Sequence, residues 1–112
     1  MLREMERGNH HHLPSLDGLH GQSIEVASLL KALAHPVRLQ LATKLAEGEY
    51  SVGALENMIG VHQPSLSQQL GVLRTAGIVD TRRESKQIFY RLSDERAASL
   101  IQSLANIFVV LE

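Results

Sequence analysis

The stretch SVGALENMIGVHQPSLSQQLGVLRTAGIVDTRRESKQIFYRL, residues 51–92, decides the fold of this chain. It contains a short apolar helix pattern, a turn, a polar helix pattern and two β-prone runs. In the first pattern Leu55, Met58 and Ile59 recur at three- and four-residue intervals, which places them on one helix face. Gly60 follows at the point where a helix end favours a left-handed residue.

The second helix pattern has its own apolar face. Leu66, Leu70 and Leu73 share that face, and Gly77 follows where the pattern ends. Pro64 suits the first helical turn, because its missing N–H would have no partner there. Two short helices that pack their apolar faces together across a glycine-containing turn form a helix-turn-helix.

The outer face of this second helix is polar but uncharged. Gln68 and Gly71 point away from the leucines, and no Asp, Glu, Lys or Arg occurs from His62 to Leu73. Glutamine can bond an adenine edge through two atoms at once, so Gln68 is the best candidate for a base contact in a major groove. A polar surface helix without a ligand is the alternative. The residues expected at or beside the groove are Gln63, Ser65, Ser67, Gln68 and Gln69.

A basic hairpin is expected after this helix. Residues 78–83 and 87–92 are β-prone runs, and the three residues between them suit a hairpin loop. Five basic and two acidic residues lie between Val61 and Arg91, a net +3, whereas the remainder has six basic and ten acidic, a net −4. Positive charge gathered beside a polar helix favours phosphate binding. The wing residues expected to contact phosphates or the adjacent minor groove are Arg82, Arg83 and Lys86.

Length and composition limit the remaining possibilities. The 112 residues predict one globular domain, 44% of them hydrophobic. The absence of cysteine excludes disulfides and thiolate metal sites. No apolar run approaches the roughly 18–20 residues that span a membrane, and no secretory signal is evident. We therefore expect a cytoplasmic protein without a membrane partner.

The N-terminal residues differ in character from the rest. Residues 1–22 are polar and interrupted by glycines, which predicts a flexible arm before a domain over residues 23–112. Three adjacent histidines lie in this arm, His10, His11 and His12. A weak metal site and a chance cluster are both possible origins of this run. Adjacent histidines in a flexible arm lack the surroundings that fix ligand geometry, so we expect no metal and no cofactor.

Two further helices are expected before the helix-turn-helix. Ser23 is a plausible N-cap for the first. Pro36 suits the start of the second, which should end near Gly48. His35 precedes that proline, and we expect it to cap or pack rather than to bind a ligand.

The last helix indicates an oligomer. It is expected to begin at Ser93, and residues 97–111 contain no charged side chain. A helix that is apolar on more than one face is buried on more than one side, and a second copy related by a two-fold axis is the simplest partner. The residues expected at this dimer interface are Leu30, Leu100, Leu104, Ile107, Phe108 and Leu111.

Three stretches resemble the ArsR family of bacterial repressors. They are LLKALAHPVRLQLATKLAEGEYSV (29–52), QPSLSQQLGVLRTAGIV (63–79) and RRESKQIFYRL (82–92). Within that family these stretches of sequence resemble the BigR/HlyU-like branch. The resemblance implies a winged-helix homodimer that binds an inverted repeat and represses transcription. It also implies that the first and last helices form the dimer contact.

The chain departs from the sensing sites of that family. Metal-sensing members carry cysteines where this chain has Ser51 and Gly53, and others use histidines on the last helix, of which there are none after residue 93. The cysteine pair of the BigR-like branch corresponds here to Thr43 and Val109. The resemblance therefore implies a regulator that is not a thiol or thiolate-metal sensor.

The expected architecture is mainly α with a small β-hairpin wing. Four helices, two strands and a fifth helix would form a dimeric winged helix-turn-helix. The expected function is a sequence-specific DNA-binding transcriptional regulator, with double-stranded DNA and a second copy as partners. A protein-interaction module is the alternative, although acidic residues at the wing tip would then be expected. An enzyme is disfavoured, because no catalytic residue is evident in a recognisable arrangement.

Overall fold

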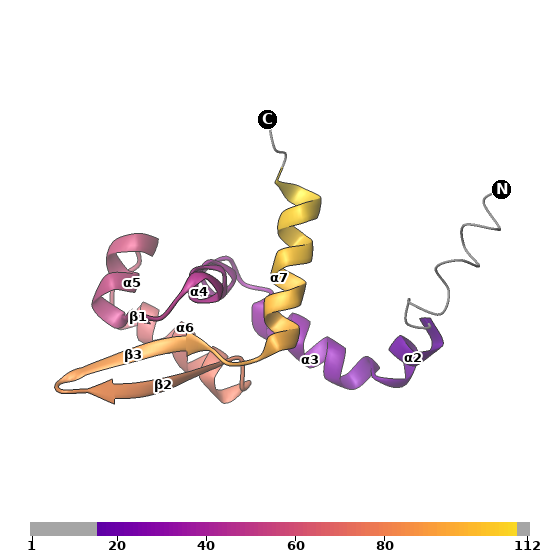
Figure 1. The fold of residues 1–112 in the computed structure, drawn as a ribbon, viewed down its shortest axis with the longest axis horizontal. Helices are drawn as coiled ribbons and strands as arrows, with labels where there is room; N and C mark the ends of the chain where they lie inside the picture. Colours follow the sequence, from indigo (N-terminus) through magenta and orange to yellow (C-terminus); the bar gives the residue numbers. More distant parts are fainter. Residues whose placement is uncertain (1–15, 110–112) are drawn as a thin grey trace.

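The computed structural model describes residues 16–109, which form helices around a small sheet (Figure 1). In chain order the elements are α2 (Leu16–Gly21), α3 (Ser23–Leu33), α4 (Pro36–Glu47), β1 (Tyr50–Ser51), α5 (Val52–Ile59), α6 (Ser65–Thr75), β2 (Val79–Glu84), β3 (Gln87–Leu92) and α7 (Glu95–Phe108). The predicted winged helix-turn-helix is confirmed, with α5 and α6 as the motif and β2–β3 as the wing. Two elements, α2 and β1, were not predicted.

The core lies where α4, α5 and α6 meet the base of the wing. Leu66, Leu70 and Leu73 of α6 are fully buried, as their spacing predicted. In α5, Leu55 is also fully buried, whereas Met58 remains 38% exposed. Successive residues turn by about 100°, which leaves Met58 at the edge of the apolar face. The other buried core residues are Ala32, Leu33, Leu41, Ala42, Leu45, Ile78, Val79, Ala97 and Ile101.

The sheet has three antiparallel strands in the order β1-β3-β2. Glu84 pairs with Gln87, so the hairpin loop is shorter than the three residues expected. Ser85 adopts a positive φ of 57° in that tight turn. The unpredicted strand β1 pairs Tyr50 with Tyr90 on β3, which ties the start of the helix-turn-helix to the wing.

Several predicted helix ends are confirmed. Gly60 ends α5 with a φ of 81°, and Gly77 follows α6 with a φ of 78°. His35 caps α4, where its Nδ1 accepts from the Val37 backbone N–H at 3.2 Å. The predicted cap at Ser23 is wrong: the helix begins at Ser23 itself, and no side chain caps it.

Part of the predicted N-terminal arm is helical. The six-residue helix α2 has no buried residue, and Leu16 and Leu19 on it are 82% and 54% exposed. Residues 1–15, including the histidines at 10–12, lie outside the described part of the chain. None of the described helices is long and apolar enough to cross a membrane.

The last helix packs against the core at its start and projects from it at its C-terminal end. α7 leaves the base of the wing and rises past α4 (Figure 1), and its final residues are strongly exposed. Ile107 is 70% exposed and Phe108 76%, whereas Leu100 and Leu104 are half-buried. On α3, Leu30 is 48% exposed. The helix ends at Phe108, and the remaining residue of the predicted interface, Leu111, lies outside the described residues.

Candidate DNA interface

The outer face of α6 is an exposed polar strip. The strip, defined here as Ser65, Ser67, Gln68, Gly71 and Thr75, is exposed along its length. The opposite face of the same helix is anchored by three fully buried leucines. A polar strip held on a rigid, anchored helix suits contact with base edges in a major groove.

A hollow of 610 Å³ lies beside this strip, between α6 and α3. On the α6 side its wall includes Gln68, Gly71 and Thr75, and on the other side it includes Lys31 and Arg38. No carboxylate from residues 16–109 lines it. Donors, acceptors and positive charge thus share one surface, which favours a nucleic-acid ligand over a cationic one.

The start of α6 is organised by hydrogen bonds. Ser67 donates through its hydroxyl to Gln63 Oε1 at 2.6 Å, and the Gln63 backbone N–H donates to Glu56 Oε2 at 3.1 Å. No residue in 16–109 accepts from the Gln63 side-chain N–H₂, so that amide remains exposed with its two donors available. The predicted reading residues Gln63, Ser65, Ser67 and Gln68 therefore lie together at one end of the strip.

Gln69 is placed differently from the other predicted reading residues. Its side chain is half-buried, and its Oε1 accepts from Arg38 Nη1 at 2.9 Å. One residue of helix rotates a side chain by about 100°, which turns Gln69 from the strip toward α4. In this structure its Oε1 is occupied within the protein.

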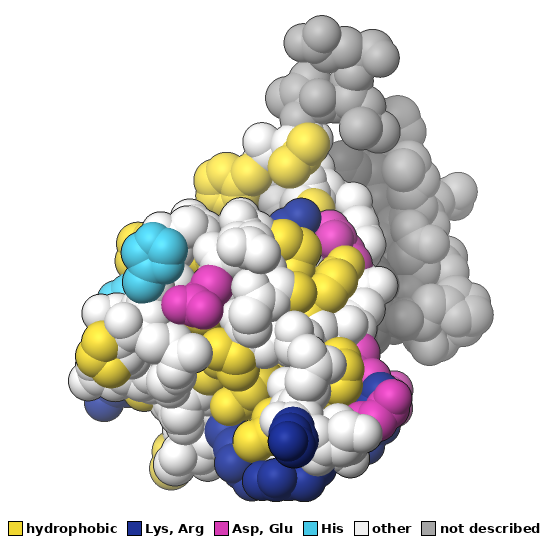
Figure 2. Space-filling model, turned by 90° about the vertical axis from the view of Figure 1, so that its left-hand side faces the viewer, with side chains coloured by type: hydrophobic (Ala, Val, Ile, Leu, Met, Phe, Trp, Pro, Cys, Tyr) yellow, Lys and Arg dark blue, Asp and Glu magenta, His cyan; other side chains and the backbone are white. Residues whose placement is uncertain are grey.

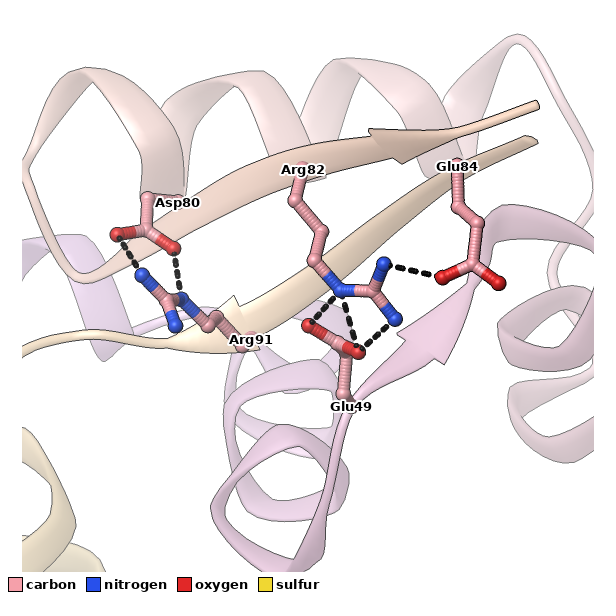
Figure 3. A network of polar contacts seen from close by, with 5 residues as sticks. All are labelled: Glu49, Asp80, Arg82, Glu84 and Arg91. Carbon is pink, nitrogen blue, oxygen red and sulfur yellow. Dashed lines mark hydrogen bonds and ion pairs between the residues drawn. The ribbon is translucent and has the colours of Figure 1, made fainter. Parts of the chain in front are cut away.

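Arg82, on wing strand β2, is held by two carboxylates, one on the wing and one just before β1 (Figure 3). Its Nε lies 2.9 Å from both oxygens of Glu49, its Nη2 lies 2.7 Å from Glu49 Oε1, and its Nη1 lies 2.6 Å from Glu84 Oε1. The guanidinium passes over the ring of Phe89, 4.8 Å from its centroid. Arg82 thus bridges the residue before β1 to β2 across the central strand. The sequence prediction of a phosphate contact did not anticipate these partners.

These contacts shift the pKa values of three charged groups, Glu49, Arg82 and Arg91. The hydrogen bond from Arg82 holds the pKa of Glu49 below its ordinary value, and Glu49 in turn raises the pKa of Arg82. Arg91 Nε lies 2.6 Å from Asp80 Oδ1, which raises the pKa of Arg91. Each of these two arginines is paired with carboxylates, so much of its charge is compensated within the protein.

Three basic residues between positions 61 and 91 have no ion-pair partner among the described residues. They are Arg74 at the end of α6, Arg83 on β2 and Lys86 in the hairpin turn, and all three are exposed. Adjacent strand residues point to opposite faces, so Arg83 lies on the face of the hairpin opposite Arg82. Figure 2 looks onto the wing and α5, and Lys and Arg side chains gather along its lower edge.

The sensing positions named by the family resemblance contain no metal ligands. Among residues 16–109, no group of three or more His, Cys, Asp or Glu side chains is arranged to hold a metal. Thr43 and Val109 instead line one apolar hollow of 290 Å³ between α4 and α7. The Thr43 hydroxyl donates to the Leu39 carbonyl at 2.7 Å.

Sequence reasoning missed the residues that hold the interface in place. Glu49 and Arg38 contact partners 33 and 31 positions away in the chain, so no local pattern reveals either contact. A weak signal exists for Arg38, because a basic residue soon after a helix end can bond its last carbonyls.

Comparisons with known proteins agree with this geometry. Residues 35–81 match the family described as bacterial regulatory protein, arsR family. The chain is 61% identical over 97 residues to the biofilm growth-associated repressor of Agrobacterium fabrum, which covers 87% of this chain and 83% of that protein.

Solved structures extend the similarity to most of the fold. The crystal structure of the transcriptional repressor BigR from Xylella fastidiosa is 55% identical, with a TM-score of 0.84 over 88% of this chain and 100% of that one. The solution structure of a homodimeric winged helix-turn-helix DNA-binding domain from Mycobacterium bovis is 33% identical, with a TM-score of 0.70 over 79% of this chain and 82% of that one.

Proposed function

This chain belongs to the arsR family of bacterial regulatory proteins, in the branch that includes BigR, and we propose that it is a homodimeric repressor of transcription that binds an inverted-repeat operator. The family is one of DNA-binding transcriptional regulators, which are not a class of enzymes. The observation that carries the proposal is the exposed, uncharged polar strip on α6, together with three basic residues on α6 and the wing that have no carboxylate partner within residues 16–109.

The two parts of the interface have different roles in this proposal. Gln68 contacts a base edge, and Gln63, Ser65 and Ser67 contact bases or the flanking backbone at the same end of α6. Arg83 and Lys86 contact phosphates or the adjacent minor groove, which holds the protein in register without much choice of sequence. Arg82 supports the shape of the wing, because its charge is already compensated by Glu49 and Glu84.

The second copy of the chain packs against α7 and α3. A two-fold axis there buries Ile107 and Phe108, which are strongly exposed in the single chain. It also presents two α6 helices to one face of the DNA. Recognition helices about 34 Å apart read half-sites one helical turn apart, so the operator is an inverted repeat.

Repression is relieved by a signal other than thiol chemistry. The chain has no cysteine, and the family resemblance aligns Thr43 and Val109 with the cysteine pair of the BigR-like branch. A small molecule, a partner protein or a change in protein level would release the operator. The proposed location is the cytoplasm, where a bacterial regulator reaches the chromosome.

Selection of bound fragments from random and genomic DNA tests the proposed function. Purified protein should enrich a sequence with two-fold symmetry whose half-site centres are about 10–10.5 base pairs apart or a multiple of this. Genomic fragments should contain the same sequence upstream of genes, and the protein should lower transcription from them in vitro. Enrichment of no sequence, or of an asymmetric single site, would contradict the proposal.

A further inference from the structure

Arg38 lies at the junction of three helices. It is the third residue of α4, and its guanidinium reaches both the end of α3 and the middle of α6. Its Nε donates to the Ala32 carbonyl at 2.6 Å, and its Nη2 lies 3.3 Å from the Lys31 carbonyl. Its Nη1 donates to Gln69 Oε1 at 2.9 Å. One side chain of α4 therefore bonds two other helices, α3 and α6.

The contacts with α3 satisfy groups that a helix end leaves open. The last four carbonyls of a helix have no partner within it, and they carry partial negative charge. Arg38 bonds two of these carbonyls, those of Ala32 and Lys31, and the Lys31 carbonyl also accepts from the Ala34 backbone N–H at 3.3 Å. The backbone N–H of His35 donates to the Leu33 carbonyl at 2.8 Å. The planar guanidinium donates in several fixed directions at once, which a lysine ammonium cannot reproduce.

The contact with α6 acts on the orientation of the reading helix. The three buried leucines decide which face of α6 points outward, but apolar contact is non-directional and fixes the exact angle of the helix only loosely. A hydrogen bond to Gln69 has a preferred direction and length. Gln69 is adjacent to Gln68, so fixing Gln69 fixes the direction in which Gln68 leaves the helix.

We propose that Arg38 is a positioning residue for DNA recognition, which sets the orientation of α6 relative to α3 by bonding Gln69 and the last carbonyls of α3 together. In this role Gln69 serves as the acceptor for Arg38 and makes no base contact of its own. Helix α3 also carries the exposed Leu30 of the proposed dimer face. Arg38 therefore couples the partner-facing helix to the reading helix and fixes the spacing between the two reading helices. This inference rests on the proposed dimeric, DNA-binding function.

A double-mutant cycle on Arg38 and Gln69 tests the proposal. The variants are Arg38→Lys, Gln69→Met and the two together, and the probe is the duplex selected by the wild-type protein. Each single change should weaken binding about tenfold, the size expected for losing a hydrogen bond to a charged group. The double variant should bind as well as the weaker single variant to within about twofold, because both changes break the same contact.

Half-site spacing provides a readout that a loss of stability would not change. Duplexes with one base pair added or removed between the half-sites should bind the wild-type protein poorly, and the Arg38→Lys protein should discriminate among them less. The control is Gln40→Met, at an exposed position on α4 outside the proposed interface, which should keep the wild-type preference. Gln69→Met leaves both carbonyl contacts of Arg38 intact and so tests the proposal even if Arg38→Lys does not fold.

Additive losses in the cycle, or unchanged spacing preference in folded Arg38→Lys and Gln69→Met, would overturn the proposal. Wild-type protein that enriches a symmetric duplex together with either of these results would overturn the role of Arg38 alone. Wild-type protein that binds no duplex would overturn the proposed function and this inference with it.

Discussion

Helices α6 and α7 are both amphipathic, but they differ in where their apolar residues end up. In α6, Leu66, Leu70 and Leu73 are fully buried, and the outer face is polar. In α7, Ile101 is only 8% exposed, whereas Phe108, the last residue of the helix, is 76% exposed. The first helix satisfies its apolar face within the chain, whereas the second carries more apolar surface than the chain covers.

This difference separates the residues that stabilise the folded chain from those that hold two chains together. Burial of a side chain inside one chain contributes to folding at any protein concentration. Burial between two chains contributes only when the second chain binds, so its effect depends on concentration. Whether the effect of a substitution depends on protein concentration therefore shows if an apolar side chain contributes to folding or to dimer formation.

The largest effect is expected from a change in the α6 core. Leu70→Ala should lower the free energy of unfolding by about 2–5 kcal/mol, because it removes buried methyl groups and leaves a cavity. Ile107→Ala, at an exposed position of α7, is the matched control. Denaturant unfolding at several protein concentrations measures both. The assignment of α6 to folding and α7 to the dimer is contradicted if the loss of unfolding free energy in Leu70→Ala depends on protein concentration. It is also contradicted if the loss in Ile107→Ala does not depend on protein concentration.

The next effect concerns the exposed end of α7. Phe108→Glu should give monomers or partly unfolded protein, because a charge at a dimer contact would be buried without a partner. Gln102→Glu, on the polar face of the same helix, should leave the dimer intact. Analytical ultracentrifugation with circular dichroism separates these outcomes. A folded Phe108→Glu monomer with full DNA affinity would contradict the assignment of α7.

A smaller effect is expected at the base-reading end of α6. Gln68→Ala should cost about 1–3 kcal/mol at the preferred duplex and relax the sequence preference at one position of each half-site. Gln40→Ala, at an exposed position on α4, is the control and should bind as wild type does. Fluorescence anisotropy on a panel of single-base variants measures both quantities. Unchanged affinity and preference would remove Gln68 from the reading residues.

Substitution of the two wing arginines, Arg82 and Arg83, should change the salt dependence of DNA binding by different amounts. Arg83→Ala should weaken binding to most sequences alike and reduce the slope of log K against log salt by about one unit for each wing. Arg82→Ala should change that slope less, because Glu49 and Glu84 already compensate its charge. Titrations at several salt concentrations measure the slopes. Equal slopes for the two variants would show that Arg82 also contacts phosphate.

The smallest effect is expected from thiol oxidants and zinc. DNA affinity should stay within tenfold, about 1.4 kcal/mol, when peroxide, polysulfide or micromolar zinc is added at fixed ionic strength. The chain has no cysteine to oxidise, and residues 16–109 contain no cluster of metal-ligating side chains. A larger loss with zinc alone would point to the histidines at positions 10–12.

The sequence predicted the parts of the fold that local patterns specify. The leucine spacing of α6, the glycines at 60 and 77 and the two β-prone runs of the wing are all short-range signals, and all are confirmed. Strand β1 was missed because two residues show no alternation, and its pairing with β3 depends on a contact 40 positions away, between Tyr50 and Tyr90. Helix α2 was missed because Gly18 and Gly21 weaken its pattern.

The sequence predicted which types of residue form the candidate interface, but not which of them are bonded to other residues of the chain. Polar residues on α6 and basic residues on the wing were evident from the sequence. The contacts that occupy Gln69 and Arg82 come from Arg38 and Glu49, on separate elements. Only the folded chain shows which polar groups are free for DNA and which are already bonded within the protein.

The number of chains bound per operator tests the account most directly. Native mass spectrometry of the wild-type protein with its selected duplex should show two chains on one duplex, and Phe108→Glu should bind the duplex weakly and as single chains. One wild-type chain bound at full affinity would contradict the account, because the exposed face of α7 would then have no role in DNA binding.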